Sequence, residues 1–336
     1  MGGASLPEPG PSEDALIARY FAPLAGPGAD GLRDDAATLT PSPGHDLVVT
    51  TDTVVAGIHF LPDDPAASIA RKALGVNLSD LAAKGASPRG FVLTLGLPEG
   101  WTEAWLADFS AGLAASIADF GCPLLGGDTV RAGGPAFVGV AAMGEVPAGT
   151  MVRRMAARIG DRLCVTGTIG DAAIGLHLAR SPAPAWARDL DEKARAALVD
   201  RYRNPRPRLA IASHLRRHAR AAMDVSDGLA GDLAKMLRGE GRSAVVAVGD
   251  IPLSCEAGLA IAREPALLDT ALTGGDDYEI LCAVPEADVA AFVAGGAAVG
   301  VPVSVIGTVT SGEGLPAFRM ADGTDRVYAL GSFSHF

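Results

Sequence analysis

Residues 47–60 read LVVTTDTVVAGIHF, and this stretch decides how the N-terminal half of the chain folds. Its valines predict a buried β-strand, because β-branched side chains pack well in sheets. Thr50, Thr51, Asp52 and Thr53 interrupt that run with three hydroxyls and a carboxylate. Burying an unpaired charge is costly, so either the strand ends here or a positive charge is expected beside Asp52.

Composition and charge restrict the functions that are open to the chain. It has 336 residues, 49% hydrophobic and 20% charged, which is typical of globular proteins and predicts two domains of ordinary size. No apolar run reaches the roughly 18 residues that span a bilayer, and the N-terminus lacks the features of a signal peptide. Four widely spaced cysteines favour a reducing compartment, so we expect a cytoplasmic protein without a membrane partner. The formal net charge of −11 argues against a nucleic-acid partner.

The segments around the opening stretch predict an α/β protein with mixed sheets. Asp64-Pro65 is typical of a helix start, with Asp64 as the N-cap and the helix continuing to Lys84. A second α/β series follows an arginine-containing loop at 147–160. We expect two domains, over residues 1–148 and 149–336. Other helices are expected at 13–24, 101–120, from 171 and at 187–203, and other strands at 91–98, 123–128, 136–146 and 162–167. The second series continues with segments at 221–229, 244–250 and 274–284 and a last pair of strands after 301.

The familiar nucleotide-binding motifs do not indicate a nucleotide site in this sequence. Residues 26–31 fit GxGxxG, but no strand precedes them and no helix follows. A P-loop requires a lysine after a glycine, and none of the four lysines has one. If the protein binds a nucleotide, it must do so by another route.

Six acidic clusters stand beside glycines or at the expected ends of strands. Each has an ordinary explanation when taken alone. Asp80 can pair with Lys84 one helical turn later, and an aspartate pair can form a turn. Ser226 or Asp227 can cap a helix that begins at Gly228. The clusters are Asp34-Asp35, Thr50-Thr51-Asp52, Asn77 to Asp80, Gly126 to Thr129, Asp224 to Gly228 and Gly274 to Asp277.

Taken together, the clusters predict a metal centre that handles phosphate. Aspartates beside glycines at strand ends lie where the backbone can approach a ligand closely. Several such carboxylates would repel one another unless cations lay between them. Carboxylates with threonine hydroxyls, and without a histidine or cysteine cluster, favour Mg²⁺ over zinc. Mg²⁺ would also let an acidic site hold polyphosphate, so we expect metal-dependent phosphoryl transfer.

Six longer motifs contain these clusters, and a seventh, VTGTIGDAAIGL, lies among them. In chain order they read GLRDDAATL, TTDTVVAGIHF, KALGVNLSDLAAKGA, GGDTVR, VTGTIGDAAIGL, MDVSDGL and TGGDDYEI. Their combination resembles the thiamine-monophosphate kinase family from about residue 13 to the C-terminus. The resemblance implies the two-domain fold of aminoimidazole ribonucleotide synthetase-like proteins and a homodimer formed through the N-terminal sheet. It also implies transfer of the γ-phosphoryl group of ATP onto the phosphate of thiamine monophosphate, giving thiamine diphosphate.

The resemblance also assigns residues to roles. It implies Mg²⁺ ligands at Asp35, Thr50, Thr51, Asp52, Asp80, Asp128, Asp224 and Asp227. It implies ATP contacts at Gly127, Asp128, Arg154 and Ser226, with Arg153 and Arg158 as alternatives to Arg154. It implies substrate contacts at His59, Asp276 and Phe333. Asp52, Asp128 and Arg154 would act at the transferring phosphoryl group.

Other readings stay open at this stage. Selenophosphate synthetase resembles the same architecture but uses a cysteine or selenocysteine with a lysine near its N-terminus, and residues 1–33 contain neither. A metal-dependent phosphatase would use water as the acceptor. A divalent-metal or nucleotide-binding module without catalysis would leave His59 and Phe333 unexplained.

Overall fold

The polar residues of the opening stretch do not end the strand. The computed structural model describes residues 12–181, 184–188, 190–239 and 241–329, and in it β1 runs without a break over His45–Val55. Val48 and Val54 are buried, whereas Thr51 and Asp52 are exposed. The strand therefore keeps Val48 and Val54 in the core and leaves its polar middle accessible.

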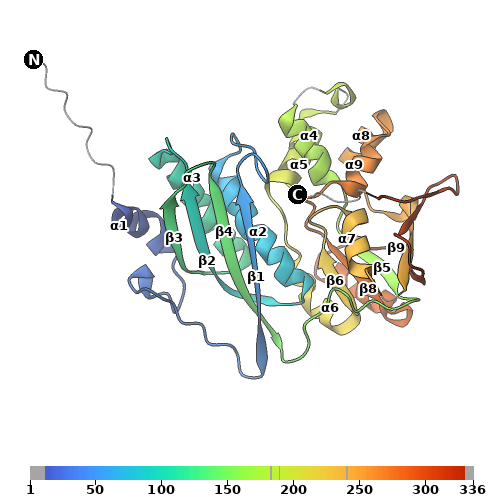
Figure 1. The fold of residues 1–336 in the computed structure, drawn as a ribbon, viewed down its shortest axis with the longest axis horizontal. Coiled ribbons are helices and arrows are strands. Elements are labelled where there is room, and N and C mark those ends of the chain that lie inside the picture. The colour runs from blue at the N-terminus through green and yellow to red at the C-terminus, as the bar shows by residue number, and fades with distance from the viewer. Residues whose placement is uncertain (1–11, 182–183, 189, 240, 330–336) are drawn as a thin grey trace, which may run out of the picture.

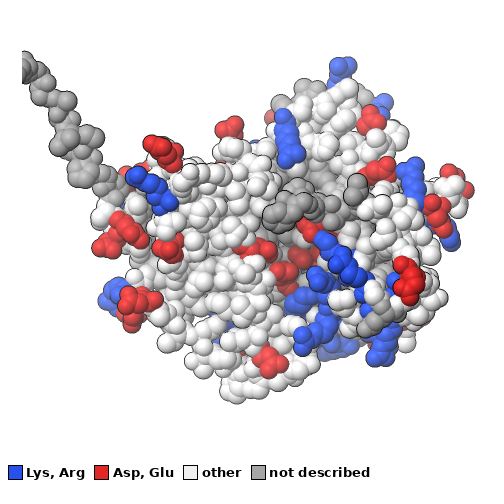
Figure 2. All heavy atoms as spheres, viewed as in Figure 1, with Lys and Arg blue, Asp and Glu red and all other residues white. Residues whose placement is uncertain are grey.

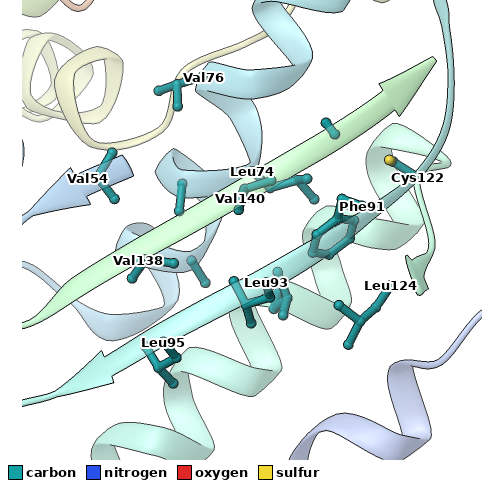
Figure 3. Packing of buried hydrophobic residues seen from close by; sticks show 14 of the residues in the cluster. Val54, Leu74, Val76, Phe91, Leu93, Leu95, Cys122, Leu124, Val138 and Val140 are labelled. Atoms are coloured by element: carbon teal, nitrogen blue, oxygen red, sulfur yellow. The ribbon is translucent and has the colours of Figure 1, made fainter. Parts of the chain in front are cut away.

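The first sheet has the strand order β1-β4-β2-β3, so β1 and β3 are its two edges. β4 pairs antiparallel with both β1 and β2, and β2 pairs parallel with β3. Figure 1 shows α2 and α3 together on one side of this sheet. Buried side chains such as Phe91, Leu93 and Leu74 fill the layer between them (Figure 3). The elements are α2 (Ala66–Ala83), β2 (Ser87–Leu97), α3 (Glu103–Phe120), β3 (Leu124–Arg131) and β4 (Phe137–Pro147), preceded by α1 (Glu13–Leu16).

The second sheet has seven strands in the order β11-β10-β7-β9-β5-β8-β6 and is also mixed. β10 pairs parallel with β7, and the other pairs are antiparallel. The prediction of an α/β protein with mixed sheets is confirmed, whereas the domain boundary near residue 148 stays a prediction. The strands are β5 (Arg162–Thr166), β6 (Ala221–Asp224), β7 (Arg242–Ala247), β8 (Ile280–Val284), β9 (Val303–Ser311), β10 (Ala317–Arg319) and β11 (Asp325–Arg326). The helices are α4 (Asp171–Arg180), α5 (Glu192–Arg203), α6 (Ala212–His218), α7 (Leu229–Leu237), α8 (Cys255–Arg263), α9 (Leu267–Thr273) and α10 (Val289–Ala298).

The start of α2 differs from the prediction. Pro65 is the N-cap, and Asp64 makes no capping bond to the helix. Asp64 instead accepts a hydrogen bond from the Leu61 amide and forms an ion pair with Arg203 of α5, 2.7 Å apart. A carboxylate that is 6% exposed requires such a partner, and Arg203 lies too far along the chain for a local pattern to indicate it.

Helix α2 contacts both sheets, because it packs on β1 and β4 and also reaches β6, β8 and α5. Lys72, Val76, Asp80 and Lys84 follow one another at four-residue intervals, which places them along one face of the helix. That face supplies several of the residues at the junction between the domains. Within the part of the chain that the structure describes, no helix is long and apolar enough to cross a membrane.

Candidate active site

Strand β1 presents its polar residues to two different sides. Thr50 and Asp52 lie on the side that faces α2, where Thr50 Oγ1 donates to Asp80 Oδ2 at 2.5 Å. The Asp52 amide donates to Asn77 Oδ1 of α2 at 2.9 Å. Thr51 lies on the opposite side, and its hydroxyl donates to a backbone carbonyl of β4 at 3.0 Å. The Thr51 hydroxyl therefore points away from the Asp80 carboxylate.

A cavity of about 540 Å³ lies between the two domains, and we call it the interdomain cavity. The N-terminal domain contributes β1, the segment after it and α2, and the C-terminal domain contributes α4, α9 and the loops around β6 and β8. Figure 2 shows acidic and basic side chains side by side where the domains meet. The cavity brings together seven of the residues that the sequence indicated, namely Asp52, His59, Asp80, Asp224, Ser226, Asp227 and Asp276.

The carboxylates in this cavity raise one another's pKa values. Lost hydration raises the pKa of Asp52 to about 6, and the charges of Asp80 and Asp227 add to the effect. Burial, followed by the charge of Asp80, raises the pKa of Asp224 well above its ordinary value. Among the described residues, no three acidic, histidine or cysteine side chains already stand together as a metal-binding group. The arrangement is electrostatically unfavourable by itself and would be stabilised by cations.

A second cavity, of about 380 Å³, adjoins the first, and we call it the basic cavity. Both Arg153 and Arg154 line it, whereas Arg158 does not. The backbone of Arg153 pairs with β6 beside the acidic loop, because the Ala222 amide donates to the Arg153 carbonyl at 3.2 Å. The remaining lining comes from both domains and consists of Asp80, Lys84, Met151, Val152, Met223, Asp224, Ser226, Asp227, Asp232 and Lys235.

Two lysines of the basic cavity were missed by the motif reading. Lys235 of α7 forms ion pairs with Asp227 and, at 2.9 Å, with Asp232. Lys84 Nζ donates to the Ala222 carbonyl at 2.8 Å, and burial lowers its pKa. The sequence signal that could have identified Lys235 was its position eight residues after Asp227 on the helix expected there. Neither Ser226 nor Asp227 caps α7, because its N-cap is Gly228 and no side chain accepts a capping hydrogen bond there.

Asp35, Gly127 and Asp128 lie elsewhere, in a hollow of about 390 Å³ at the β3 edge of the first sheet. We call it the β3 hollow. β1 and β3 are separated by β4 and β2, and three interstrand spacings of about 4.8 Å place these edges roughly 14 Å apart. One chain alone therefore does not bring Asp128 close to Asp52.

His59 is oriented by the backbone at the end of β1. The Val55 amide donates to its Nδ1 at 3.0 Å, so a neutral ring carries its proton on Nε2. The ring lines the interdomain cavity. This backbone hydrogen bond orients the Nδ1 side of the imidazole toward the backbone.

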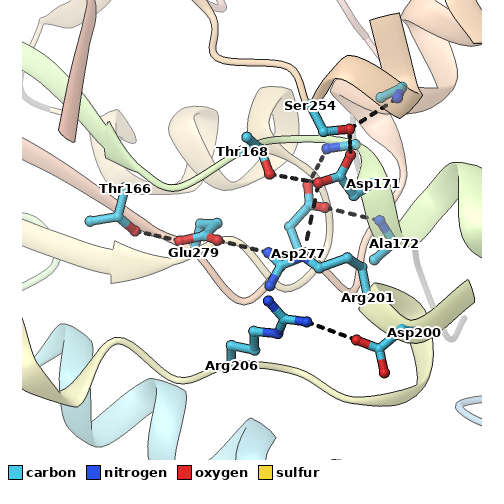
Figure 4. A network of polar contacts seen from close by, with 12 residues as sticks. Thr166, Thr168, Asp171, Ala172, Asp200, Arg201, Arg206, Ser254, Asp277 and Glu279 are labelled. Carbon is cyan, nitrogen blue, oxygen red and sulfur yellow. Dashed lines mark hydrogen bonds and ion pairs between the residues drawn. The ribbon is translucent and has the colours of Figure 1, made fainter. Parts of the chain in front are cut away.

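The GGDDYE loop divides its acids between structure and cavity. Asp277 is buried and accepts a hydrogen bond from the Gly170 amide at 2.8 Å. Glu279 accepts from Arg201 at 2.7 Å within the polar network of Figure 4. Asp276, between glycine and Asp277, lines the interdomain cavity instead. Asp277 and Glu279 thus hold the loop through buried polar contacts, whereas Asp276 is directed toward the cavity.

Comparison with known proteins places the chain. Residues 33–146 match the family model for the AIR synthase related protein, N-terminal domain, and residues 158–318 match the one for its C-terminal domain. A thiamine-monophosphate kinase from Caulobacter vibrioides is 44% identical over 92% of this chain and 87% of its own length. The chain belongs to the thiamine-monophosphate kinase family. The family that the motifs predicted is thereby confirmed.

Two solved members of the thiamine-monophosphate kinase family share the fold over nearly the whole chain. The kinase from Stenotrophomonas maltophilia is 37% identical with a TM-score of 0.78, covering 88% of this chain and 91% of that one. AaThiL complexed with AMPPCP and TMP is 27% identical with a TM-score of 0.76, covering 96% and 94%. Phe333, the third predicted substrate contact, lies outside the described residues.

Proposed function

We propose that this protein transfers the γ-phosphoryl group of ATP to the phosphate of thiamine monophosphate, giving thiamine diphosphate. The interdomain cavity carries the proposal, because it collects carboxylates suited to metal-bound phosphates beside His59 and Asp276. The family relationship supports it, since the Caulobacter relative is a thiamine-monophosphate kinase and AaThiL was solved with an ATP analogue and TMP. We place the reaction in the cytoplasm.

The chemistry requires little of the protein beyond neutralising and positioning charge. The acceptor is a phosphate oxygen, which is already anionic near neutral pH because its second pKa is about 6. No strong general base is needed, unlike in transfer to a hydroxyl. The main barrier is the approach of two anions, and Arg154, with Arg153 beside it, would offset part of their charge.

The donor set fits Mg²⁺. The cavity is lined by five aspartates and several hydroxyl side chains, and burial, followed by the charges of neighbouring aspartates, raises the pKa values of Asp52 and Asp224. Bound Mg²⁺ would neutralise phosphate charge at this place. The proposed ligands are Asp35, Thr50, Asp52, Asp80, Asp128, Asp224 and Asp227, together with Thr51 on the opposite side of β1, whose hydroxyl does not face Asp80. Gly127, Asp128, Arg154 and Ser226 would contact ATP, and His59, Asp276 and Phe333 would contact thiamine monophosphate.

A second copy of the chain would complete the site. The aspartates proposed as metal ligands divide between the interdomain cavity and the β3 hollow, at opposite edges of one sheet. The face of that sheet away from α2 exposes Leu47 by 41%, Val49 by 64% and Val92 by 38%. We propose that two such faces pack together in a homodimer, which would bring Asp128 of one copy toward Asp52 of the other.

The test incubates the protein with ATP, Mg²⁺ and thiamine monophosphate and separates the thiamine phosphates by chromatography. We expect equal amounts of thiamine diphosphate and ADP. Omitting thiamine monophosphate should stop ADP formation. Unphosphorylated thiamine should not serve as an acceptor in its place. Asp52→Asn should remove turnover, while Asp250→Asn, at an exposed aspartate in the C-terminal domain, should retain it. ADP release without an acceptor would instead favour a phosphatase.

A further inference from the structure

Lys72 is a buried lysine directly behind the wall of the interdomain cavity. Its side chain is 2% exposed, and its Nζ lies 3.0 Å from Asp276 Oδ2. Asp276 lines the cavity and is itself 21% exposed, whereas Lys72 is absent from the lining. Lys72 therefore forms its ion pair with the Asp276 carboxylate on the side facing away from the cavity.

The ammonium group is fixed by partners from the C-terminal domain. Nζ lies 4.0 Å from the ring centroid of Tyr202, a cation–π contact in a place that excludes water. Tyr202 is 1% exposed, and its hydroxyl donates to Asp64 Oδ2 at 3.2 Å. Asp64 is in turn paired with Arg203. The position of Lys72 is thus set by packing rather than by a flexible surface contact.

The backbone at Asp276 needs such support. Its φ is 75°, a left-handed conformation that is uncommon for residues other than glycine. Its amide donates to the Ser226 carbonyl at 2.9 Å, so the loop of Asp276 is tied to the acidic loop after β6. This bond holds the backbone, but it does not fix the direction of the carboxylate. The described contact that fixes it is the ion pair with Lys72.

We propose that Lys72 is a positioning residue for the Asp276 carboxylate, holding one oxygen so that the other is presented to the cationic thiazolium ring of the substrate. This inference rests on the proposed function. Lys72 does not touch the substrate or the reacting phosphates, so its role is confined to the binding of the thiamine end. An uncharged substitution should therefore weaken binding of thiamine monophosphate and leave binding of ATP unchanged.

The experiment measures the KM of each substrate and kcat for Lys72→Met, Lys72→Arg, Asp276→Asn and the Lys72→Met/Asp276→Asn double variant. We expect Lys72→Met to raise the KM for thiamine monophosphate about tenfold or more, the size expected when a hydrogen bond to a charged group is lost. The KM for ATP and kcat should change by less than about threefold. Lys72→Arg, which keeps the charge, should restore most of the affinity. In the Asp276→Asn background, Lys72→Met should add nothing.

The matched control is Arg71→Met on the same helix. Arg71 also combines an ion pair, 2.7 Å from Asp119, with a cation–π contact to Phe120, but it faces α3. The Arg71→Met variant should leave the KM for ATP and the KM for thiamine monophosphate unchanged. An unchanged KM for thiamine monophosphate in Lys72→Met, or an equal effect without Asp276, would overturn the inference. If Lys72→Met does not fold, Lys72→Gln replaces it in the same comparison of single and double variants. A wild-type protein that forms no thiamine diphosphate would refute the proposed function instead.

Discussion

Asp52→Asn should stabilise the protein in the absence of metal while removing its activity. In the folded protein the pKa of Asp52 is raised from 3.8 to about 6 by lost hydration and by the charges of Asp80 and Asp227. Above pH 6 the folded state therefore carries an ionised carboxylate that the unfolded state tolerates better. As the pH falls from 6 to 4, the folded state binds the proton first, and this destabilisation disappears.

The magnitude follows from the size of the shift. At 1.36 kcal/mol per pKa unit, a change from 3.8 to about 6 sets an upper limit of roughly 3 kcal/mol. The Asp52 side chain still reaches solvent, which screens its interactions, so we expect about 1 kcal/mol at pH 7.5. For a chain of this size, that corresponds to a rise in Tm of about 2 °C.

The assay is thermal and urea unfolding of wild type and Asp52→Asn in EDTA, at pH 7.5 and at pH 4.5. The variant should be more stable at pH 7.5, and the difference should shrink at pH 4.5. Adding Mg²⁺ and ATP should stabilise the wild type more than the variant and reverse the order. Asp250→Asn should stay within about 0.5 kcal/mol of wild type throughout. A variant that is less stable than wild type in EDTA at pH 7.5 would refute the electrostatic reasoning.

Two further predictions test the assembly of the site and the packing of its loops. Asp52→Asn and Asp128→Asn should each be inactive alone, but mixing them under conditions that exchange subunits should restore about one quarter of wild-type activity. Half of the dimers would then be mixed, and each mixed dimer would have one intact site out of two. No recovery after verified exchange would show that the site lies within one chain. Gly275→Ala should lower the free energy of unfolding by about 1–3 kcal/mol in urea titrations, because its Cβ would lie 2.2 Å from the Ser226 carbonyl oxygen. Gly258→Ala on α8 meets no atom within 4 Å and should be neutral or stabilising, so equal effects at the two glycines would contradict the packing reasoning.

The acidic side of the interdomain cavity could be read from the sequence. Asp52, Asp80 and Asp227 each stand next to a hydroxyl residue, Asp224 lies two residues before Ser226, and such polar clusters are candidates for ligand binding. Their convergence was a hypothesis that required cations, since several carboxylates at one place otherwise repel one another. The structure places all four around one cavity.

The separation of Asp128 from Asp52 could not be read in the same way. It depends on the strand order β1-β4-β2-β3, in which the last strand in sequence enters between the first two. Hydrophobic periodicity indicates that a strand exists but does not give its neighbours. The pairing of Asp64 with Arg203 was hidden for a similar reason, because its partners lie 139 residues apart.

The lysines of α2 show how a single helix can organise a site that motif reading only outlines. Lys72, Asp80 and Lys84 share one face, and each is directed at the C-terminal domain or at the cavity between the domains. Eight residues of helix separate Lys72 from Asp80, which corresponds to about 12 Å along the axis. Because a helix is rigid on this scale, the acid held by Lys72 and the carboxylate at Asp80 cannot shift independently. α2 therefore fixes the distance between the part of the site proposed for the thiamine ring and the part proposed for the phosphates.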